Sequence, residues 1–207
     1  MGVPAGPVAT FASAAGSFAT LVRGIPRGRW DGPGLGDWDL RSLVGHTSRS
    51  LITVSTYLHT TVEREDIATP AEYYARVNPS ALGLDSSAVV ERGRQAGRDL
   101  GDDPAAAVDE LVQRVLSELA TAGDPLIQVI GGLGIRLHTY LPTRTFELAV
   151  HGLDIAGAVG LPHGLPAGVL EAATLLATQT AAATGYGETV LLALTGRGAL
   201  PPSFSVV

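Results

Sequence analysis

Apolar residues recur every three to four positions along most of this 207-residue chain, a spacing that predicts amphipathic helices. Helices are expected at about residues 6–23, 39–59, 86–100, 104–122, 142–159 and 166–184. Asp39 and Asp103 are placed to begin two of them, because a short acidic side chain accepts the free amide hydrogens of a first turn. Pro104 suits the position directly after such a cap. The pattern therefore predicts an all-α bundle.

The segments between these helices are rich in Gly and Pro, which favour turns. Residues 66–85 are expected to be loop-like with at most one short turn of helix, and the Gly-rich stretch 131–142 is expected to be a connection. The stretch 188–197 is short enough for a strand or for the last turn of a helix. Because no repeat or long linker divides the chain, we expect a single domain over 1–207, with a core at about 8–186 and a short tail at 187–207.

The predicted helix at 142–159 carries a narrow polar strip. Its four members are Arg144, Glu147, His151 and Asp154, and at about 100° per residue they share an arc of roughly 80°. The rest of the circumference is apolar, so the helix should be largely buried. Two interpretations are open at this point. Either the strip faces water and forms ion pairs along the helix, or it faces the bundle interior and supplies two ligands to a metal ion.

His46 is the candidate for a third ligand. It lies in the segment "DWDLRSLVGHTSRS", at the edge of the apolar arc of the helix at 39–59. A histidine in that position can also be a hydrogen-bonded core residue. Two imidazoles and a carboxylate suit Zn²⁺ or another first-row divalent ion, and three protein ligands leave a coordination position open, as in catalytic sites. We expect His59, His138 and His163 not to be ligands, because they lie on the far side of a helix or in connections.

The composition narrows the possible functions. Hydrophobic residues make up 45% of the chain, and the net charge of −6 argues against a generic nucleic-acid binder. All fourteen basic residues are Arg, which is typical of a GC-rich genome. Cysteine is absent, so any thiol chemistry must use a thiol from outside. The Ala-rich start lacks the basic region of a signal peptide, and no apolar stretch is long enough to span a membrane, so we expect a soluble, cytoplasmic protein.

Two motifs resemble those of a known family. "DWDLRSLVGHTSRS" (37–50) is similar to the N-terminal signature of the mycothiol-dependent maleylpyruvate isomerase family, a Trp followed by a helix that reads roughly x-R-D-L-V-x-H. "RTFELAVHGLDIAGAVGLP" (144–162) is similar to its second signature, an Arg, then E-x-x-x-H-G-x-D, then small residues ending in "GLP". The order and separation of the motifs also match, and the resemblance extends over about residues 8–196.

This resemblance implies a fold and a metal site. Members of the family resemble DinB-like four-helix bundles, and their metal ligands match His46, Glu147 and His151, which usually hold zinc. Similar proteins use the metal to bind the thiolate of mycothiol or of a related small thiol, which attacks an electrophilic substrate. The resemblance thus favours the inward-facing interpretation of the strip.

The resemblance also implies roles for neighbouring residues. Trp38 and Leu43 match structural positions of the first motif. Arg144 and Asp154 flank the ligands in the second motif, and they would support the metal ligands or pair with an anion. About fifty residues follow the second motif, too few for the additional C-terminal α+β domain of the two-domain isomerase. The resemblance therefore does not assign maleylpyruvate as the substrate, and the identity of the small electrophile stays open.

The sequence leads to one main hypothesis and two alternatives. The main hypothesis is a metal-dependent enzyme that transfers a mycothiol-like thiol to a small electrophile or isomerises that electrophile, with Arg49 and Tyr57 lining the cavity. One alternative is hydrolysis or isomerisation by metal-bound water without a thiol. The other is a non-catalytic binding protein. We expect no nucleic-acid or membrane partner, and the Ala/Gly-rich terminal helices leave a homodimer open.

Overall fold

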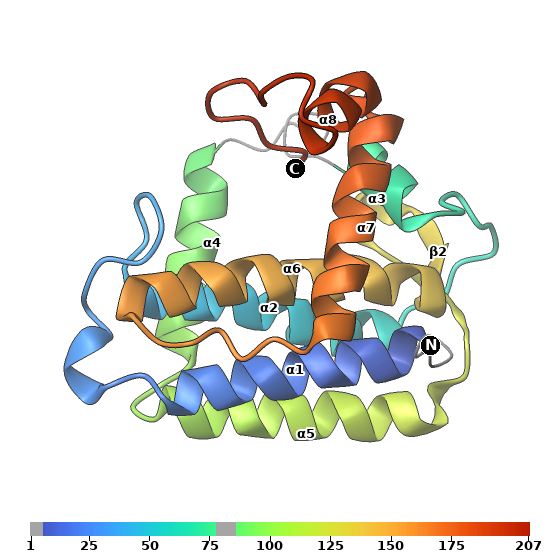
Figure 1. Ribbon diagram of the computed structural model, residues 1–207. Helices are drawn as coiled ribbons and strands as arrows, with labels where there is room; N and C mark the ends of the chain where they lie inside the picture. Colours follow the sequence, from blue (N-terminus) through green and yellow to red (C-terminus); the bar gives the residue numbers. More distant parts are fainter. Residues whose placement is uncertain (1–5, 78–85) are drawn as a thin grey trace.

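The computed structural model describes residues 6–77 and 86–207, which are mostly helical (Figure 1). The helices are α1 (Pro7–Arg23), α2 (Leu40–Leu58), α3 (Pro70–Arg76), α4 (Ser86–Asp99), α5 (Pro104–Ala122), α6 (Leu137–Val159), α7 (Ala167–Ala183) and α8 (Gly187–Leu194). Two short antiparallel strands, β1 (Leu126–Gln128) and β2 (Gly134–Arg136), form a hairpin before α6. Single 3₁₀ turns occur at Arg27–Arg29 and Ile130–Gly132.

The predicted helix starts are confirmed at two positions. The Asp39 carboxylate accepts a hydrogen bond from the Ser42 amide at 2.7 Å, and the Asp103 carboxylate accepts one from the Ala106 amide at 3.1 Å. These bonds satisfy amide groups that have no partner inside their own helix. The cap at Asp39 matters for the candidate site, because it fixes where α2 begins and hence which of its residues face inward.

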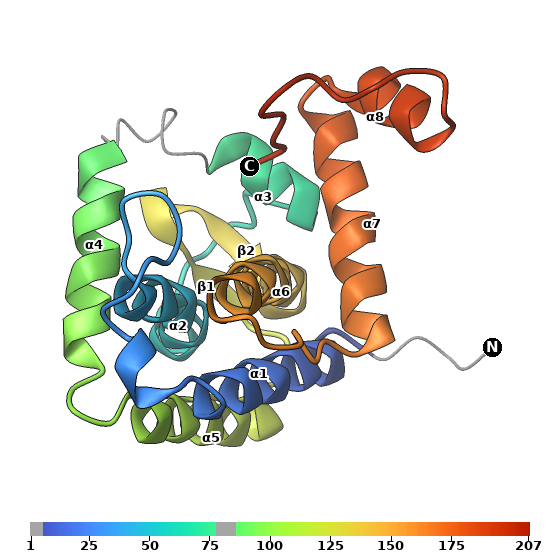
Figure 2. The ribbon, with the colours of Figure 1, turned by 60° about the vertical axis from the view of Figure 1, so that its left-hand side comes forward.

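Four helices form the central bundle. Among α1, α2, α5 and α6, each helix packs against two of the others. Figure 2 views α2 and α6 nearly end-on, with α1 and α5 below them, α4 on one side and α7 on the other. The helix α4 packs along α2, and α8 packs on the far end of α7. The all-α, DinB-like bundle expected from the sequence is confirmed.

The helices α2 and α4 approach each other until their backbones touch. Both residues at the crossing, Gly45 and Gly97, are glycines, and a side chain on Gly45 would collide with the backbone of Gly97. The two small residues therefore allow a spacing that no larger pair would permit. Because His46 directly follows Gly45, this crossing also sets how close His46 lies to α4.

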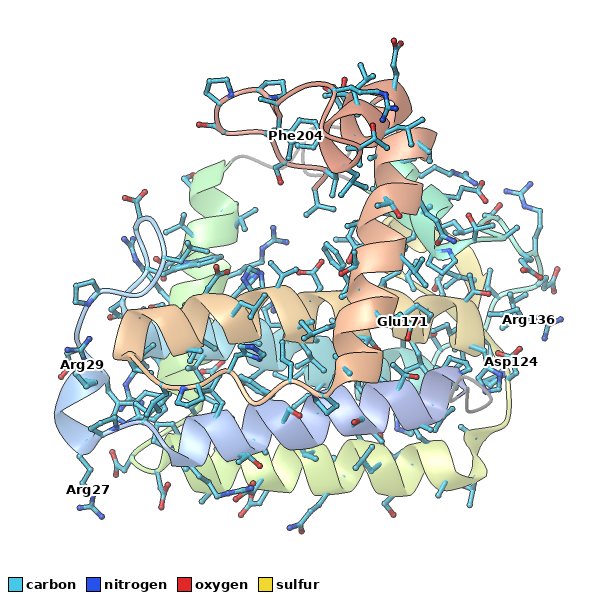
Figure 3. All side chains as sticks on the ribbon, in the orientation of Figure 1. Arg27, Arg29, Asp124, Arg136, Glu171 and Phe204 are labelled. Atoms are coloured by element: carbon cyan, nitrogen blue, oxygen red, sulfur yellow. The ribbon has the colours of Figure 1, made fainter. Side chains whose placement is uncertain are left out.

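The core lies between the four bundle helices and is built from aromatic and branched aliphatic residues. Its largest fully buried side chains include Phe11 and Phe18 from α1, Leu43 and Leu51 from α2, and Tyr140 from α6. Charged side chains lie mainly outside it: Figure 3 labels Arg27, Arg29, Asp124 and Arg136 at the edges of the view, and Glu171 on α7 is exposed as well. Within the described part of the chain, no helix combines the length and apolar character needed to cross a membrane.

Three predictions about secondary structure are wrong. The helix α6 begins at Leu137, not near Pro142, and Pro142 lies inside it. The reason is the hairpin, whose approach brings the Asp124 carboxylate to the His138 amide at 2.7 Å and so starts the helix earlier. The stretch 131–142 is therefore part hairpin and part helix, not a simple connection.

The third wrong prediction concerns the tail, where α8 is a separate short helix and not a strand or the last turn of another helix. In the segment 66–85, the short helical turn expected within the loop is the seven-residue helix α3. Residues 78–85, with Pro79, lie outside the described residues.

Candidate metal centre

The polar strip of α6 faces α2 in the bundle interior. Glu147 and His151 lie one turn apart on α6, and His46 projects from α2 toward them. One possible ligand atom from each residue lies within 4.8 Å of the other two, and this is the one such group of three in residues 6–77 and 86–207. The side chains of Glu147 and His151 are only 20% and 15% exposed. The strip therefore does not face open solvent.

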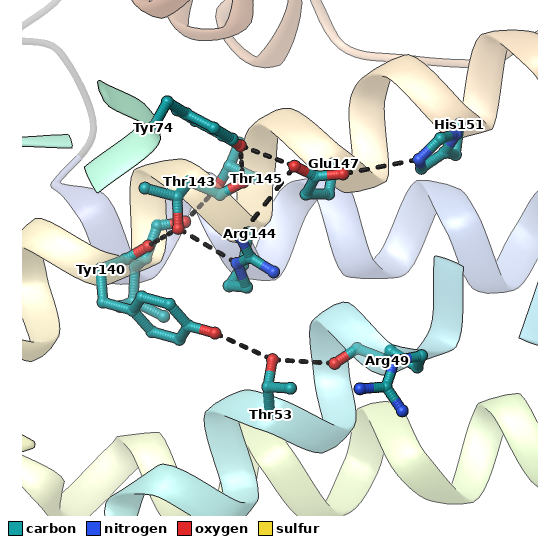
Figure 4. A network of polar contacts seen from close by, with 10 residues as sticks. Arg49, Thr53, Tyr74, Tyr140, Thr143, Arg144, Thr145, Glu147 and His151 are labelled. Carbon is teal, nitrogen blue, oxygen red and sulfur yellow. Dashed lines mark hydrogen bonds and ion pairs between the residues drawn. The ribbon is translucent and has the colours of Figure 1, made fainter. Parts of the chain in front are cut away.

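Glu147 and His151 are each held by neighbouring groups, and Figure 4 shows those around Glu147. His151 places Nε2 at 3.5 Å from a Glu147 oxygen, while its Nδ1 lies 3.0 Å from an Asp154 oxygen. A carboxylate behind an imidazole fixes the orientation of the ring, a common arrangement around metal-binding histidines. On Glu147, Oε1 accepts a hydrogen bond from the Tyr74 hydroxyl at 2.8 Å. Tyr74 comes from α3, so three segments of the chain meet at this site.

Arg144 lies beside the carboxylate of Glu147. Its Nη2 atom is 4.0 Å from Glu147 Oε1, and its guanidinium lies over the rings of Tyr73 and Tyr140, at 5.4 and 5.0 Å from their centroids. The Nε–H of Arg144 donates to the Thr143 hydroxyl at 3.1 Å. Two aromatic faces and a nearby carboxylate make this a favourable place for a cation that is only 13% exposed.

The surroundings of His46 differ from those of His151. The indole of Trp38 stacks on the His46 ring, with centroids 4.4 Å apart and planes 30° apart. The His46 and His151 rings meet edge to face at 5.0 Å. Among the described residues, the buried Nδ1 of His46 has no hydrogen-bond partner. Ring packing, and not a bond at Nδ1, therefore holds this imidazole.

These surroundings shift the pKa values of all three residues. Burial and the neighbouring His151 lower the pKa of His46 to about 4, so this imidazole is neutral at neutral pH. Burial opposes the charged form of His151, but its hydrogen bonds to Asp154 and Glu147 outweigh burial and raise its pKa to about 9. For Glu147, burial is likewise outweighed by the hydrogen bond from His151 and the charge of Arg144, which lower its pKa to about 2. Without a bound ion, the cluster at neutral pH thus pairs an ionised Glu147 with a protonated His151 beside a neutral His46, and a metal ion would displace the proton of His151.

The three residues fit a divalent metal ion. At zinc–ligand lengths of about 2.0–2.2 Å, two ligand atoms of a tetrahedral site lie roughly 3.4 Å apart. Ligand atoms already within 4.8 Å of each other need only small side-chain movements to reach that spacing. Two imidazoles and one carboxylate also form a donor set that suits zinc and other first-row divalent ions.

The structure places the other two cavity candidates differently. Arg49, one turn after His46 on α2, is half-buried, and its charge contributes to the lowered pKa of His46. Tyr57 lies further along α2 and packs against Tyr140, with ring centroids 5.7 Å apart. Tyr57 is thus grouped with the aromatic residues beside Arg144 and not with the three possible ligands.

The remaining histidines have other neighbours, and none belongs to a three-residue group within the described residues. His59 lies 3.9 Å from Glu118, and His138 lies 3.8 Å from Asp124. The ring of His163 accepts a hydrogen bond from the Leu165 amide. That these three histidines are not ligands stays a prediction.

Sequence reasoning missed Tyr74 as a site residue. It lies in a segment expected to be mostly loop, where no helical periodicity indicates which side chains face inward. The available signal is the pair Tyr73–Tyr74 in "AEYYAR", directly after a Thr-Pro sequence that begins α3. Two adjacent tyrosines in an otherwise polar stretch indicate a buried segment, although not which group they contact.

Comparison with known proteins gives one family. The family model described as "Mycothiol maleylpyruvate isomerase N-terminal domain" matches residues 11–156, well over half of the chain. The matched range includes His46, Glu147 and His151 and ends two residues after Asp154. Neither a curated protein nor a solved structure matches the chain significantly.

Proposed function

The chain belongs to the mycothiol maleylpyruvate isomerase N-terminal domain family, and we propose that it is a metal-dependent enzyme that uses a small thiol. The thiol would be mycothiol or a similar molecule, and the reaction would be S-transfer to a small electrophile or its isomerisation. The observation that carries this proposal is the convergence of possible ligand atoms from His46 on α2 and from Glu147 and His151 on α6.

His46, Glu147 and His151 would hold the ion, for which we propose Zn²⁺. A bound divalent ion lowers the pKa of a coordinated thiol, which supplies a thiolate nucleophile at neutral pH. The chain contains no cysteine, so this thiol has to be a separate molecule. The three protein ligands leave coordination positions for it.

The neighbouring residues have separate roles in this proposal. Asp154 accepts from His151 Nδ1 and keeps Nε2 directed toward Glu147. Tyr74 donates to one oxygen of Glu147 and so orients the carboxylate. Within the described residues, the hydrogen bond of Arg144 runs from Nε to Thr143. We assign its remaining donors to an anionic group of the substrate or thiol, because a guanidinium pairs well with carboxylates.

Metal content tests the site. We expect elemental analysis to find zinc in the purified wild-type protein and to find little in His46→Ala and His151→Ala. The matched control is His59→Ala, because the side chain of His59 is 74% exposed and far from the strip. Equal metal in all four proteins would overturn the site assignment.

Activity tests the chemistry. The protein would be demetallated, refilled with Zn²⁺ and assayed with a panel of small thiols and electrophiles. The proposal expects thiol conjugation or isomerisation that depends on both the metal and the thiol. Turnover that needs metal but no thiol would favour metal-bound water instead. A protein that is purified without chelators, holds far less than one metal ion per chain and shows no turnover after Zn²⁺ is added would favour a binding role. The homodimer and the cytoplasmic location expected from the sequence stay predictions.

A further inference from the structure

Trp38 lies where three parts of the chain meet. It is the second-last residue before α2, its ring stacks on His46, and its indole also contacts α4. The backbone of Trp38 is fixed as well: its amide donates to the Leu35 carbonyl, and its carbonyl accepts from the Gly34 amide, each at 3.0 Å. The side chain therefore projects from a turn whose backbone is held by two hydrogen bonds.

The contact with α4 holds the indole through its N–H group. The indole N–H donates to the Val90 carbonyl at 2.9 Å. At Gly93, one turn further along α4, an added Cβ would lie 2.6 Å from the indole ring atoms Nε1 and Cε2. A side chain at this position is thus incompatible with the observed ring position. Gly93 leaves the space in which the indole lies against the α4 backbone.

The contact with His46 distinguishes this ligand from the other two. Glu147 is held by Tyr74, and His151 is held by Asp154, in both cases through hydrogen bonds. The buried Nδ1 of His46 has no such partner among the described residues, while its ring face is covered by Trp38 at a centroid distance of 4.4 Å. Stacking on Trp38 takes the place that a hydrogen bond takes at the other two ligands.

We propose that Trp38 is the positioning residue for His46 and that Gly93 on α4 makes its position possible. The inference rests on the proposed function only in treating His46 as a metal ligand; the stacking itself involves no metal. It predicts that the indole, fixed between α4 and α2, determines the orientation of the His46 ring. A change on α4 that never touches a ligand should therefore weaken metal binding.

Four variants test this inference in the full-length protein. Trp38→Ala removes the stack, Trp38→Phe keeps an aromatic face but loses the bond to Val90, and Gly93→Ala displaces the indole while leaving it present. Gly16→Ala is the matched control, because a Cβ there meets nothing within 4 Å. Circular dichroism establishes that each variant is folded before binding is measured.

Zn²⁺ affinity is the first readout, measured on demetallated protein by competition with a chromophoric chelator. Trp38→Ala and Gly93→Ala should bind Zn²⁺ on the order of 10-fold more weakly, the lower end of the effect of losing a ligand's supporting partner. Trp38→Phe should recover part of the loss, and Gly16→Ala should bind as the wild type does. If Trp38→Ala fails to fold, Gly93→Ala decides. Wild-type affinity in folded Gly93→Ala and Trp38→Ala would overturn the inference.

The second readout needs no metal. In the metal-free protein, the ring protons of His46 should be shifted by the ring current of Trp38, as seen by NMR with His46→Ala as the assignment standard. Gly93→Ala should change that shift, and Trp38→Ala should abolish it. An unshifted His46 ring would overturn the inference. A shifted ring in a wild-type protein that binds no Zn²⁺ would overturn the proposed function while leaving the stack established.

Discussion

Two carboxylates of this protein, Asp66 and Glu147, are both held by internal partners, but only Glu147 lies beside two histidines. Asp66 lies just before α3, where one oxygen contacts Arg64 at 2.7 Å and the other accepts from the Gly134 amide at 2.9 Å. Glu147 lies on α6, where Tyr74 and His151 contact it from two sides. We call the first region the Asp66 junction (Arg64, Asp66 and Gly134) and the second the metal centre (His46, Glu147 and His151).

The hydrogen bonds of the Asp66 junction are made within the junction itself. The Asp66 and Ile67 amides both donate to the Gly134 carbonyl, at 2.8 and 3.0 Å, so backbone and side chain together attach this loop to the hairpin. Both carboxylate oxygens have a protein partner. Each group is satisfied within the fold, and such a site contributes stability without needing a ligand.

The metal centre brings one possible ligand atom from each of its three residues within 4.8 Å of the other two. Its members are an ionised carboxylate and two imidazoles, a donor set that suits a first-row divalent ion. All three of its members are possible metal ligands, whereas the partners of Asp66 are an arginine and a backbone amide, so we assign binding to the metal centre and structural support to the Asp66 junction. The difference predicts that substitutions in the metal centre impair metal binding, whereas those in the Asp66 junction impair folding.

The largest effect is expected for Glu147→Gln. The neutral amide removes a charged ligand, so Zn²⁺ affinity should fall by more than the roughly 100-fold that marks the upper end for losing a supporting partner. The measurement is chelator competition, with circular dichroism as a check on folding. Unchanged affinity in the folded variant would remove Glu147 from the site.

The next largest effect is expected for Asp154→Asn. The amide can still accept from His151 but lacks the negative charge, so the ring is held less firmly in the orientation needed for binding. Zn²⁺ affinity should fall by roughly 10–100-fold. The matched control is Glu171→Gln, which neutralises an exposed carboxylate on α7 and should bind as the wild type does. Equal losses in both variants would mean that overall charge and not Asp154 controls binding.

The geometry of the metal centre could be predicted in part, because helical periodicity alone places Glu147, His151 and Asp154 on one face of α6; their binding of a metal stays a prediction. His46 lies on a second helix, α2. Its assignment as a ligand follows from its place at the rim of the apolar arc of that helix, together with the family resemblance. In both cases the information is local, since residues three and four apart on a helix must share a face. That these two faces meet inside the bundle is a property of tertiary packing.

The Asp66 junction and Tyr74 were not predictable. The strands β1 and β2 are three residues each, too short for a period of two to be recognised. Pro142 was interpreted as a helix start, but the Asp124 carboxylate, fourteen residues before His138, starts α6 earlier. Tyr74 reaches Glu147 only because the short helix α3 packs on α6. All of these features depend on contacts between segments that no local pattern encodes.

A smaller effect on binding is expected for Tyr74→Phe. The change removes one hydrogen bond to Glu147 and keeps the ring, which packs edge to face on Phe146. Zn²⁺ affinity should fall by on the order of 10-fold or less, because the carboxylate keeps its other neighbours. Tyr186→Phe, an equivalent change on an exposed ring, is the control. A loss as large as that of Glu147→Gln would show that Tyr74 does more than orient the carboxylate.

Asp66→Asn is expected to leave Zn²⁺ binding unchanged and to lower the stability of the fold instead. The hydrogen bond from the Gly134 amide, together with Arg64, lowers the pKa of Asp66 below its usual 3.8. A lowered folded-state pKa contributes stability above the unfolded-state pKa, and this contribution is lost as pH falls through the folded-state pKa. Asp66→Asn should therefore lower the melting temperature at pH 7, and its difference from wild type should vanish in strong acid.

Thermal unfolding of wild type and Asp66→Asn across this pH range, beside a Zn²⁺ titration at pH 7, completes the comparison. Arg76 bonds to the backbone carbonyl of Asp66, a contact that the substitution leaves in place, so α3 should still deliver Tyr74 to Glu147. Zn²⁺ affinity should then equal that of the wild type. A variant that lost Zn²⁺ affinity while keeping its melting temperature would show that the junction serves the metal centre, and the two regions would have to be treated as one.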